Sequence, residues 1–178
     1  MVTLETERLF LRPLELGDIP QLVPLIGSPE VAATTLRIPY PYTEEHARQF
    51  IAGSAELSSK NHFGIFRKED DQLLGGIGLR TEEDQQRAEL GYWIGAPYWG
   101  KGYATESAWA VVAYGFETLK FHRIYASHFQ GNNISGNVLR KLGMNHEGCQ
   151  RGHILKAGKF LDSELFGLLR SEWEARNR

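Results

Sequence analysis

The chain has 178 residues, of which 42% are hydrophobic, so it can bury one sizeable core and we predict a single domain over residues 1–178. Its formal charge of −2 at pH 7 provides no broad basic surface for phosphates, and we therefore expect no direct nucleic-acid binding. The single cysteine, Cys149, excludes an internal disulfide framework, and the absence of a leader pattern or a long apolar run predicts a cytoplasmic protein without membrane attachment.

The N-terminal part is predicted to contain one strand and two helices. Residues Leu4–Leu14 alternate apolar and polar side chains, as in a half-buried strand. Asp18 is expected to cap a helix that ends at Ile26, and Thr43 to cap a helix that ends near Ser58. Residues Ala33–Tyr42 hold two prolines and two tyrosines without periodicity, which predicts a loop. The buried side of the second helix is expected to consist of Phe50, Ile51 and Leu57.

Three strands are predicted next, as an antiparallel meander with charged turns between them. Their ranges are His62–Arg67, Leu73–Arg80 and Arg87–Ile94. A helical stripe of mostly small residues then runs from Ala104 to Leu119, which allows close packing on a sheet. The strand predicted after this helix makes a strand–helix–strand crossover.

The C-terminal part is predicted to alternate strands with one more helix. A strand over Arg123–Phe129 precedes a helix over Ile134–Leu142, which Gly143 ends in a left-handed conformation. A final pair of strands covers His146–Leu155 and Phe160–Leu169. The sum of these elements is an α+β fold. Cys149 falls in the first strand of the final pair, where we expect a small buried side chain without nucleophilic activation.

The junction between the strand Arg87–Ile94 and the helix from Ala104 has the features of an anion site. The first backbone N–H groups of a helix have no helical partner and carry partial positive charge, and Gly100 and Gly102 let an anion approach the backbone. The run GAPYWGKG, residues 95–102, spells a P-loop up to its last position, where Gly102 replaces the Ser or Thr that binds magnesium. A dinucleotide GxGxxG is absent, so the pattern argues against both nucleotide classes.

The run WGKGYA, Trp99–Ala104, resembles the Q/R-x-x-G-x-G/A pyrophosphate loop of the GNAT N-acetyltransferases, and YWGKGYATES is similar to their RimJ/RimL branch. Trp99 departs from the Gln or Arg of the pattern, which removes a side-chain donor and leaves the backbone donors in place. The resemblance extends from TERLFLRPL near the N-terminus to LLRSEW near the C-terminus. It implies a mixed, largely antiparallel central sheet of about six to seven strands, flanked by about four helices.

The resemblance also implies acetyl-CoA as acyl donor and an amine-bearing acceptor, either a peptide or ribosomal-protein N-terminus or a small amine. The implied coenzyme-binding residues are Trp93, Ile94, Trp99, Gly100, Lys101, Gly102, Tyr103, Ala104, Thr105, Asn132, Ser135 and Lys141. The six histidines show no HExxH motif and no clustered ligand spacing, so no metal site is expected. Both a monomer and a homodimer are compatible with the pattern.

Glu89 is the candidate general base. It interrupts an apolar strand, and alternation puts Glu89, Gly91 and Trp93 on one face. A carboxylate there must be solvated, paired or in use, and a partly buried one is a stronger base. The resemblance implies that Glu89 deprotonates the amine and that the Trp93 backbone N–H holds the developing oxyanion. The alternative is a carboxylate paired in solvent with Arg80 or Arg87.

Ser135 is the candidate general acid. It shares a helix face with Val138, Leu139 and Leu142, so it points inward and needs a polar partner. The resemblance implies that this partner is the coenzyme sulfur; the position where many relatives carry Tyr is Leu139. It further implies that Asn132 binds the pantetheine arm and that Lys141 neutralises phosphate. A backbone bond of Ser135 and simple N-capping by Asn132 are the structural alternatives.

Two other functions stay open at this stage. A non-catalytic acyl-CoA sensor would use the same loop without releasing thiol. A nucleoside triphosphate enzyme would need magnesium-dependent ATP binding, which the missing hydroxyl at Gly102 disfavours.

Overall fold

The computed structural model describes residues 2–53 and 61–176. Its strands hydrogen-bond in the order β1-β2-β3-β4-β5-β6-β8-β7, and the described residues also form six α-helices. The α+β class and the mixed, mostly antiparallel sheet are therefore confirmed, with more strands and helices than expected. The contacts group the chain into two compact units. The first unit is Met1–Arg80 with Gly91–Val111, and the second is Thr81–Leu90 with Val112–Arg178. The single-domain assignment stays a prediction.

The first strand region of the first unit differs from the prediction. The predicted strand over Leu4–Leu14 is two short strands, β1 (Leu4–Glu5) and β2 (Leu9–Arg12), which pair antiparallel with each other. Thr6 makes the turn between them: its N–H donates to the Leu9 carbonyl over 3.0 Å, and its Oγ1 accepts from the Leu9 N–H over 3.0 Å. Alternation of apolar residues does not reveal such a reversal, because it continues through the turn.

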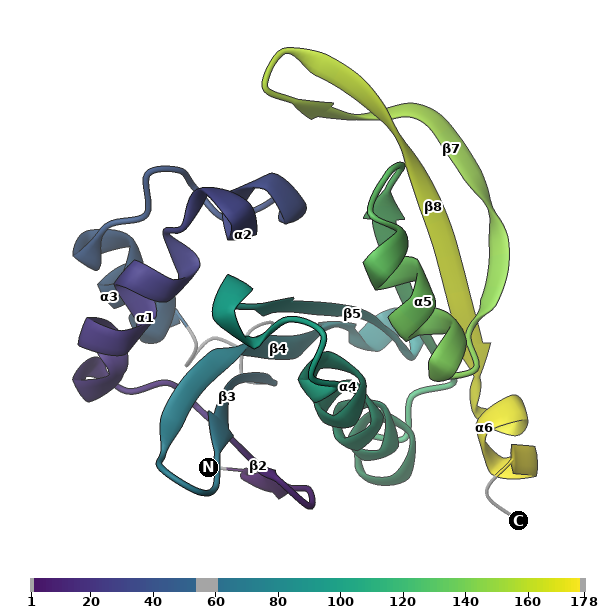
Figure 1. The fold of residues 1–178 in the computed structure, drawn as a ribbon. Helices are drawn as coiled ribbons and strands as arrows, with labels where there is room; N and C mark the ends of the chain where they lie inside the picture. Colours follow the sequence, from purple (N-terminus) through teal and green to yellow (C-terminus); the bar gives the residue numbers. More distant parts are fainter. Residues whose placement is uncertain (1, 54–60, 177–178) are drawn as a thin grey trace. The chain divides into compact units, whose positions relative to one another are not determined.

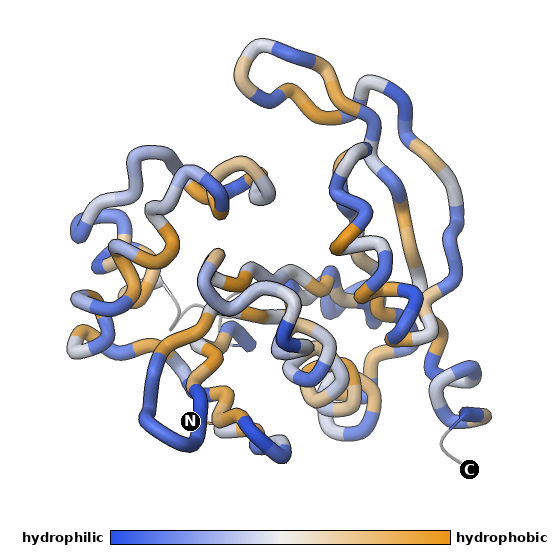
Figure 2. Tube along the Cα trace, viewed as in Figure 1, coloured by the Kyte–Doolittle hydropathy of each residue, from blue (hydrophilic) through white to orange (hydrophobic). Residues whose placement is uncertain are grey.

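β2 pairs antiparallel with β3 (His62–Arg67), which pairs antiparallel with β4 (Gln72–Glu82). β5 (Arg87–Ile94) starts in the second unit and ends in the first. Figure 2 shows apolar residues along β3 and β4 and a hydrophilic turn between them, at residues 68–71. The predicted meander is therefore confirmed for β3 and β4, with β4 two residues longer at its C-terminal end.

Three helices, α1 (Ile19–Ile26), α2 (Pro29–Thr34) and α3 (Glu44–Gly53), belong to the first unit. Asp18 precedes α1 but its side chain does not cap the helix, contrary to the prediction. The carboxylate instead accepts two hydrogen bonds from the Arg12 guanidinium, at 2.8 and 2.9 Å. Thr43 is confirmed as the N-cap of α3, because its Oγ1 accepts from the His46 N–H over 3.3 Å.

Helix α2 was not expected, since it occupies the residues just before and at the start of the predicted loop. Ser28 accepts from the Val31 N–H over 3.3 Å and Pro29 occupies the first helical position, so α2 has both usual start signals. The residues past α3, up to residue 60, lie outside the described residues, and so does the predicted burial of Leu57.

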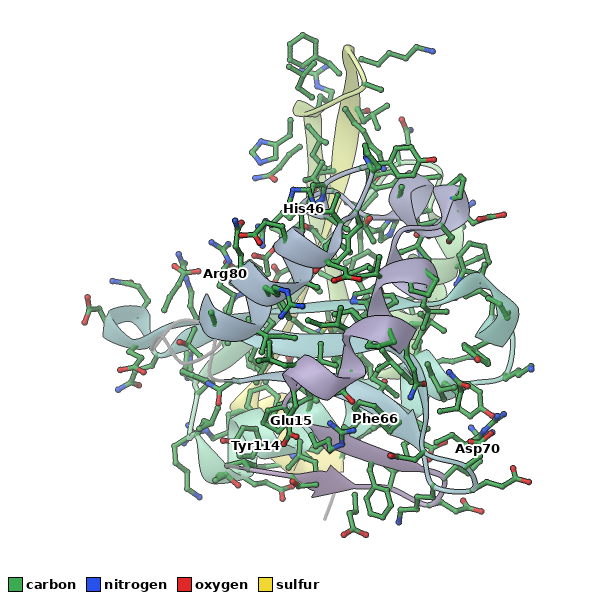
Figure 3. All side chains as sticks on the ribbon, turned by 90° about the vertical axis from the view of Figure 1, so that its left-hand side faces the viewer. Glu15, His46, Phe66, Asp70, Arg80 and Tyr114 are labelled. Atoms are coloured by element: carbon green, nitrogen blue, oxygen red, sulfur yellow. The ribbon has the colours of Figure 1, made fainter. Side chains whose placement is uncertain are left out.

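The core of the first unit lies between α1–α3 and the strands. Phe66 of β3 is buried there, whereas Asp70 lies at the outer end of the β3–β4 turn (Figure 3). Phe50 is 42% exposed, so its predicted place on the buried side of α3 is wrong, while Ile51 is partly buried against the core. The buried core residues are Ile19, Leu22, Ile26, Val31, Ala47, Phe66 and Leu73.

The predicted crossover starts from β5 and ends in the second unit. The chain leaves β5, passes through α4 (Tyr103–Ala113) and one π-helical turn (Tyr114–Thr118), and enters β6 (Arg123–Phe129). β5 and β6 pair in parallel, with Ala88 opposite Ile124. Parallel neighbours require such a connection, so the strand–helix–strand prediction is confirmed.

A long hairpin of β7 (Asn145–Lys156) and β8 (Lys159–Leu169) completes the second unit (Figure 1). β8 also pairs antiparallel with β6, and α5 (Asn133–Lys141) contacts β6. Gly143 has φ +81°, which confirms the predicted left-handed end of α5. Helix α6 (Arg170–Arg176) was not expected; it places Trp173 against Phe116 with ring centroids 5.8 Å apart.

Candidate functional site

The predicted anion loop has the backbone that its sequence requires. After β5 ends, Gly100 and Gly102 take φ values of +75° and +84°, and α4 begins at Tyr103. The Glu106 N–H donates to the Gly102 carbonyl over 3.0 Å, which is the first bond of the helix. The N–H groups of residues 103–105 precede that bond, so they have no acceptor within the helix. Together with the helix dipole they make a positive end suited to an anion.

The Trp99 side chain forms a hydrogen bond within this loop. Its indole Nε1 donates to the Ile94 carbonyl over 2.6 Å, although the side chain is 40% exposed. The next residue after Ile94, Gly95, donates its N–H to the Leu74 carbonyl over 2.8 Å. The residue that departs from the Gln or Arg of the GNAT pattern thus ties the loop to the end of β5.

Trp93 is half-buried and packs against the core of the first unit. A Cβ on Gly76 would lie 2.6 Å from the indole Nε1, and one on Gly75 would lie 2.2 Å from the Trp93 carbonyl oxygen. Gly75 and Gly76 of β4 therefore leave the room that Trp93 of β5 needs to lie this close to β4. The Trp93 indole therefore packs against the core, and Ile94 beside it is buried.

Two side chains that the sequence analysis missed lie against the loop. Arg8 donates through NH1 to the Lys101 carbonyl over 3.2 Å and through Nε to Glu106 Oε2 over 2.7 Å. Thr6 donates to Glu106 Oε1 over 2.6 Å. Both belong to the TERLFLRPL run, which carries part of the family resemblance and contains no predicted site residue. The first unit thus assembles the loop residues with a segment nearly one hundred positions away in the chain.

Glu89 lies in the second unit, on β5. It is half-buried, and its partner in the parallel register is Tyr125 of β6. Arg87, one of the two expected alternative partners of Glu89, forms an ion pair with Glu82, with 2.7 Å between NH2 and Oε2. The Tyr125 hydroxyl donates to the other oxygen of Glu82 over 2.6 Å.

The second unit also contains the predicted residues of α5. Asn132 is its N-cap: Oδ1 accepts from the Ser135 N–H over 3.3 Å, as the structural alternative expected. Ser135 is half-buried in the first turn, followed by buried Gly136. Lys141 is exposed at the other end of the helix, about 13 Å along the axis from Asn132 at 1.5 Å per residue.

Comparison with known proteins identifies the family. A family described as "Acetyltransferase (GNAT) domain" matches residues 8–145. The chain belongs to the GNAT acetyltransferase family. This GNAT chain is 36% identical over 97% of its length to the uncharacterized N-acetyltransferase p20 of Bacillus licheniformis, of which it covers 99%.

One further relative supports the RimJ/RimL type, and one solved structure shares the fold. The [ribosomal protein uS5]-alanine N-acetyltransferase of Escherichia coli is 30% identical over 63% of this chain and 59% of its own length. The solved structure of RimL, a ribosomal L7/L12 alpha-N-protein acetyltransferase in complex with coenzyme A, superposes with a TM-score of 0.86 over 96% of this chain and 99% of that one, at 20% identity. The chain is therefore a GNAT N-acetyltransferase with RimJ/RimL-type homologues.

His128 of this GNAT chain was also missed, and no motif points to it. It is 8% exposed and stacks on Phe166 with ring centroids 5.6 Å apart. Nδ1 lies 3.1 Å from the Phe129 carbonyl, which only accepts, so Nδ1 carries the proton. Among the described residues, Nε2 is buried and has no hydrogen-bond partner. It faces the first turns of α5, since a Cβ on Gly136 would lie 2.8 Å from it.

Cys149 is exposed, so its predicted burial is wrong. It faces the neighbouring strand, where Glu164 is its register partner. Local desolvation and Glu164 raise the pKa of the thiol, which disfavours the nucleophilic thiolate. Within residues 2–53 and 61–176 no group of three His, Cys, Asp or Glu side chains is placed to hold a metal ion, and none of the helices is long and apolar enough to span a bilayer.

Proposed function

We propose that this N-acetyltransferase transfers the acetyl group of acetyl-CoA to a primary amine by direct attack in a ternary complex. The observation that carries the proposal is the loop before α4. Its two positive-φ glycines and the N–H groups of residues 103–105, which have no acceptor within the helix, fit the diphosphate of a coenzyme. A side chain at Gly102 would instead meet the Arg8 guanidinium at 3.4 Å.

The remaining coenzyme contacts are assigned by the family resemblance. Asn132 would bind the pantetheine arm through its side chain, and Lys141 would neutralise a phosphate. The complete proposed binding set is Trp93, Ile94, Trp99, Gly100, Lys101, Gly102, Tyr103, Ala104, Thr105, Asn132, Ser135 and Lys141.

Bound acetyl-CoA supplies a thioester carbonyl that an amine can attack. Glu89 accepts a proton from the ammonium form of the acceptor, so that the nitrogen has a lone pair for attack. The Trp93 N–H donates to the carbonyl oxygen as negative charge develops there, an interaction typically worth about 3 kcal/mol of barrier. Ser135 Oγ–H gives its proton to the sulfur as the C–S bond breaks and the C–N bond forms, and it takes a proton back from solvent. The second amine proton leaves to solvent.

We propose a protein N-terminus as the acceptor. The Escherichia coli relative acts on the alanine of a ribosomal protein, and the similarity of this chain to it supports an N-terminal amine over a side-chain or small-molecule amine. A local docking surface is then required rather than a basic face, because the net charge is only −2.

The test combines binding and turnover. Calorimetry with coenzyme A and acetyl-CoA is expected to show saturable binding, and thiol release is expected to depend on added peptides with a free N-terminal amine. The same peptides with a blocked N-terminus are the matched control and should release no thiol above background. Spermidine as the preferred acceptor would replace the peptide assignment, and failure to bind either coenzyme would refute the donor site.

A further inference from the structure

The first turn of α4 is tied to the N-terminal segment by an unusually complete set of bonds. Glu106 Oε1 accepts from the Thr6 hydroxyl over 2.6 Å and from the Arg8 backbone N–H over 2.9 Å. Oε2 accepts from Arg8 Nε over 2.7 Å and lies 2.6 Å from Arg8 NH2. Thr6 also makes the turn between β1 and β2, where its Oγ1 accepts from the Leu9 N–H. The network therefore joins a fixed turn of the N-terminal segment to the first turn of α4.

Arg8 also contacts the loop itself. Its NH1 donates to the Lys101 carbonyl over 3.2 Å, and its NH2 would lie 3.4 Å from a Cβ on Gly102. Its guanidinium carbon stands 4.7 Å from the centroid of the Tyr103 ring. One guanidinium therefore contacts Lys101 and Tyr103 and binds the carboxylate of Glu106, one turn further along. Its planar fork allows these contacts at the same time, which a lysine ammonium does not.

The charge of Glu106 explains why such a partner is needed. Burial alone would raise the pKa of this carboxyl group, but the hydrogen bonds from Thr6 and from the Arg8 backbone and guanidinium outweigh burial and lower it. Glu106 is therefore ionised at neutral pH. A carboxylate in the first turn interacts favourably with the positive end of the helix dipole. The same negative charge repels a second anion that binds at this helix end. The loop thus needs a compensating cation close to Glu106.

We propose that Arg8 is the positioning residue of the coenzyme loop: it holds residues 101–103 in place and cancels the charge of Glu106, so that a diphosphate is accepted at the start of α4. The proposal rests on the proposed function, which places a coenzyme diphosphate there. Arg8 does not touch the reacting atoms in this scheme. Its loss raises the KM for acetyl-CoA and leaves kcat at saturating donor nearly unchanged.

The decisive experiment is a double-mutant cycle on coenzyme A affinity. Arg8→Gln leaves the Glu106 charge uncompensated and is expected to raise the Kd by about tenfold or more, whereas Glu106→Gln alone is expected to change it by less than about threefold. The double variant is expected to recover to within about threefold of Glu106→Gln. The penalty of Arg8→Gln should shrink in high salt, because screening weakens the repulsion.

The ion pair between Lys68 and Glu5 provides a matched control. Lys68 Nζ lies 3.2 Å from Glu5 Oε2, in the same unit, and Lys68→Gln removes one positive charge without touching the loop. Its coenzyme affinity is expected to equal that of the unmodified protein. Circular dichroism and thermal unfolding check that each variant folds. If Arg8→Gln does not fold, Arg8→Lys tests the positioning contacts instead, because it retains the charge and loses the planar fork. A raised coenzyme A Kd in Arg8→Lys is then expected, and an unchanged Kd would overturn the positioning role.

The outcomes separate two failures. If the unmodified protein does not bind coenzyme A, the proposed function fails. If it binds and Arg8→Gln binds equally well, Arg8 has no positioning role. A double variant as weak as Arg8→Gln overturns charge compensation, because removal of the carboxylate would then bring no relief.

Discussion

The His128 imidazole lies so close to Gly136 that residue 136 has no room for a side chain. The imidazole stacks on Phe166, and a Cβ added at Gly136 would lie only 2.8 Å from its Nε2. Gly136→Ala is therefore expected to lower the free energy of unfolding by about 1–3 kcal/mol, the usual cost of overpacking. Urea denaturation measures it.

Gly17→Ala is the control for this substitution, because a Cβ there meets nothing within 4 Å. It should leave the free energy of unfolding within about 0.5 kcal/mol. Adding His128→Ala to Gly136→Ala should cost less than the sum of the two single changes, since the alanine methyl then has room. Full additivity would show that the contact does not limit packing.

Glu89 is the residue whose proposed role is most directly measurable. Glu89→Gln keeps the shape and removes the proton acceptor, so turnover at neutral pH is expected to fall by about 10- to 1000-fold while coenzyme affinity is retained. The pH–rate profile of the variant should lose its acidic limb. The exposed Glu83, in the turn before β5, gives the control Glu83→Gln, which should behave as the unmodified protein. An unchanged pH–rate profile for Glu89→Gln would remove it from the mechanism.

At the scale of elements, the start of α4 carries the proposed coenzyme site. Gly102 has φ +84°, so Gly102→Ala strains the backbone and brings a methyl group toward Arg8. We expect a stability loss of about 1–3 kcal/mol and a clear rise in the coenzyme Kd. Gly158 has a similar φ of +77° with open space around it, in the β7–β8 turn. Gly158→Ala should lose comparable stability and bind coenzyme normally; equal binding losses in both variants would contradict a local role of the loop.

The elements that the sequence predicted well are those with a regular period and a clear end. The helix after the glycine loop and the strands Arg123–Phe129 and Phe160–Leu169 are examples, because their pattern has no interruption. The β1–β2 turn was missed because a side chain, Thr6, makes it without Gly or Pro. Asp18 was predicted to be a helix cap from its residue type alone, whereas in the structure its carboxylate accepts hydrogen bonds from the Arg12 guanidinium. Such competition between partners cannot be read from local sequence.

At the scale of the whole molecule, long-range pairing limited the prediction of the site. The glycine loop was found because its residues are contiguous. Arg8 and Glu106 were missed because their bond joins positions 98 apart, and neither residue is unusual in its own segment. The family match over residues 8–145 includes both, so the contact lies within the part that the GNAT relatives share. The role of Glu89 and Ser135 stays a prediction from resemblance.

The charged pairs of both units also predict how stability depends on pH. Hydrogen bonds from Arg123 lower the pKa of Glu147, and bonds from Thr6 and Arg8 lower that of Glu106 in spite of its burial. A carboxyl group with a lower pKa when folded binds fewer protons than in the unfolded chain, so it stabilises the fold above its unfolded pKa of about 4.3. That stability is lost as the pH falls through the folded pKa.

The urea midpoint is therefore expected to fall steadily from about pH 5 downward, and less steeply in Glu106→Gln and Glu147→Gln than in the unmodified protein. Glu174→Gln, which alters an exposed glutamate of α6, serves as the control and should follow the unmodified curve. Each affected variant should be less stable than the unmodified protein at pH 7, and the difference should shrink as the pH falls through the folded pKa of the carboxyl group that the variant lacks. Parallel curves for all four proteins would mean that these ion pairs contribute nothing to folding, and the lowered pKa values would have to be rejected with them.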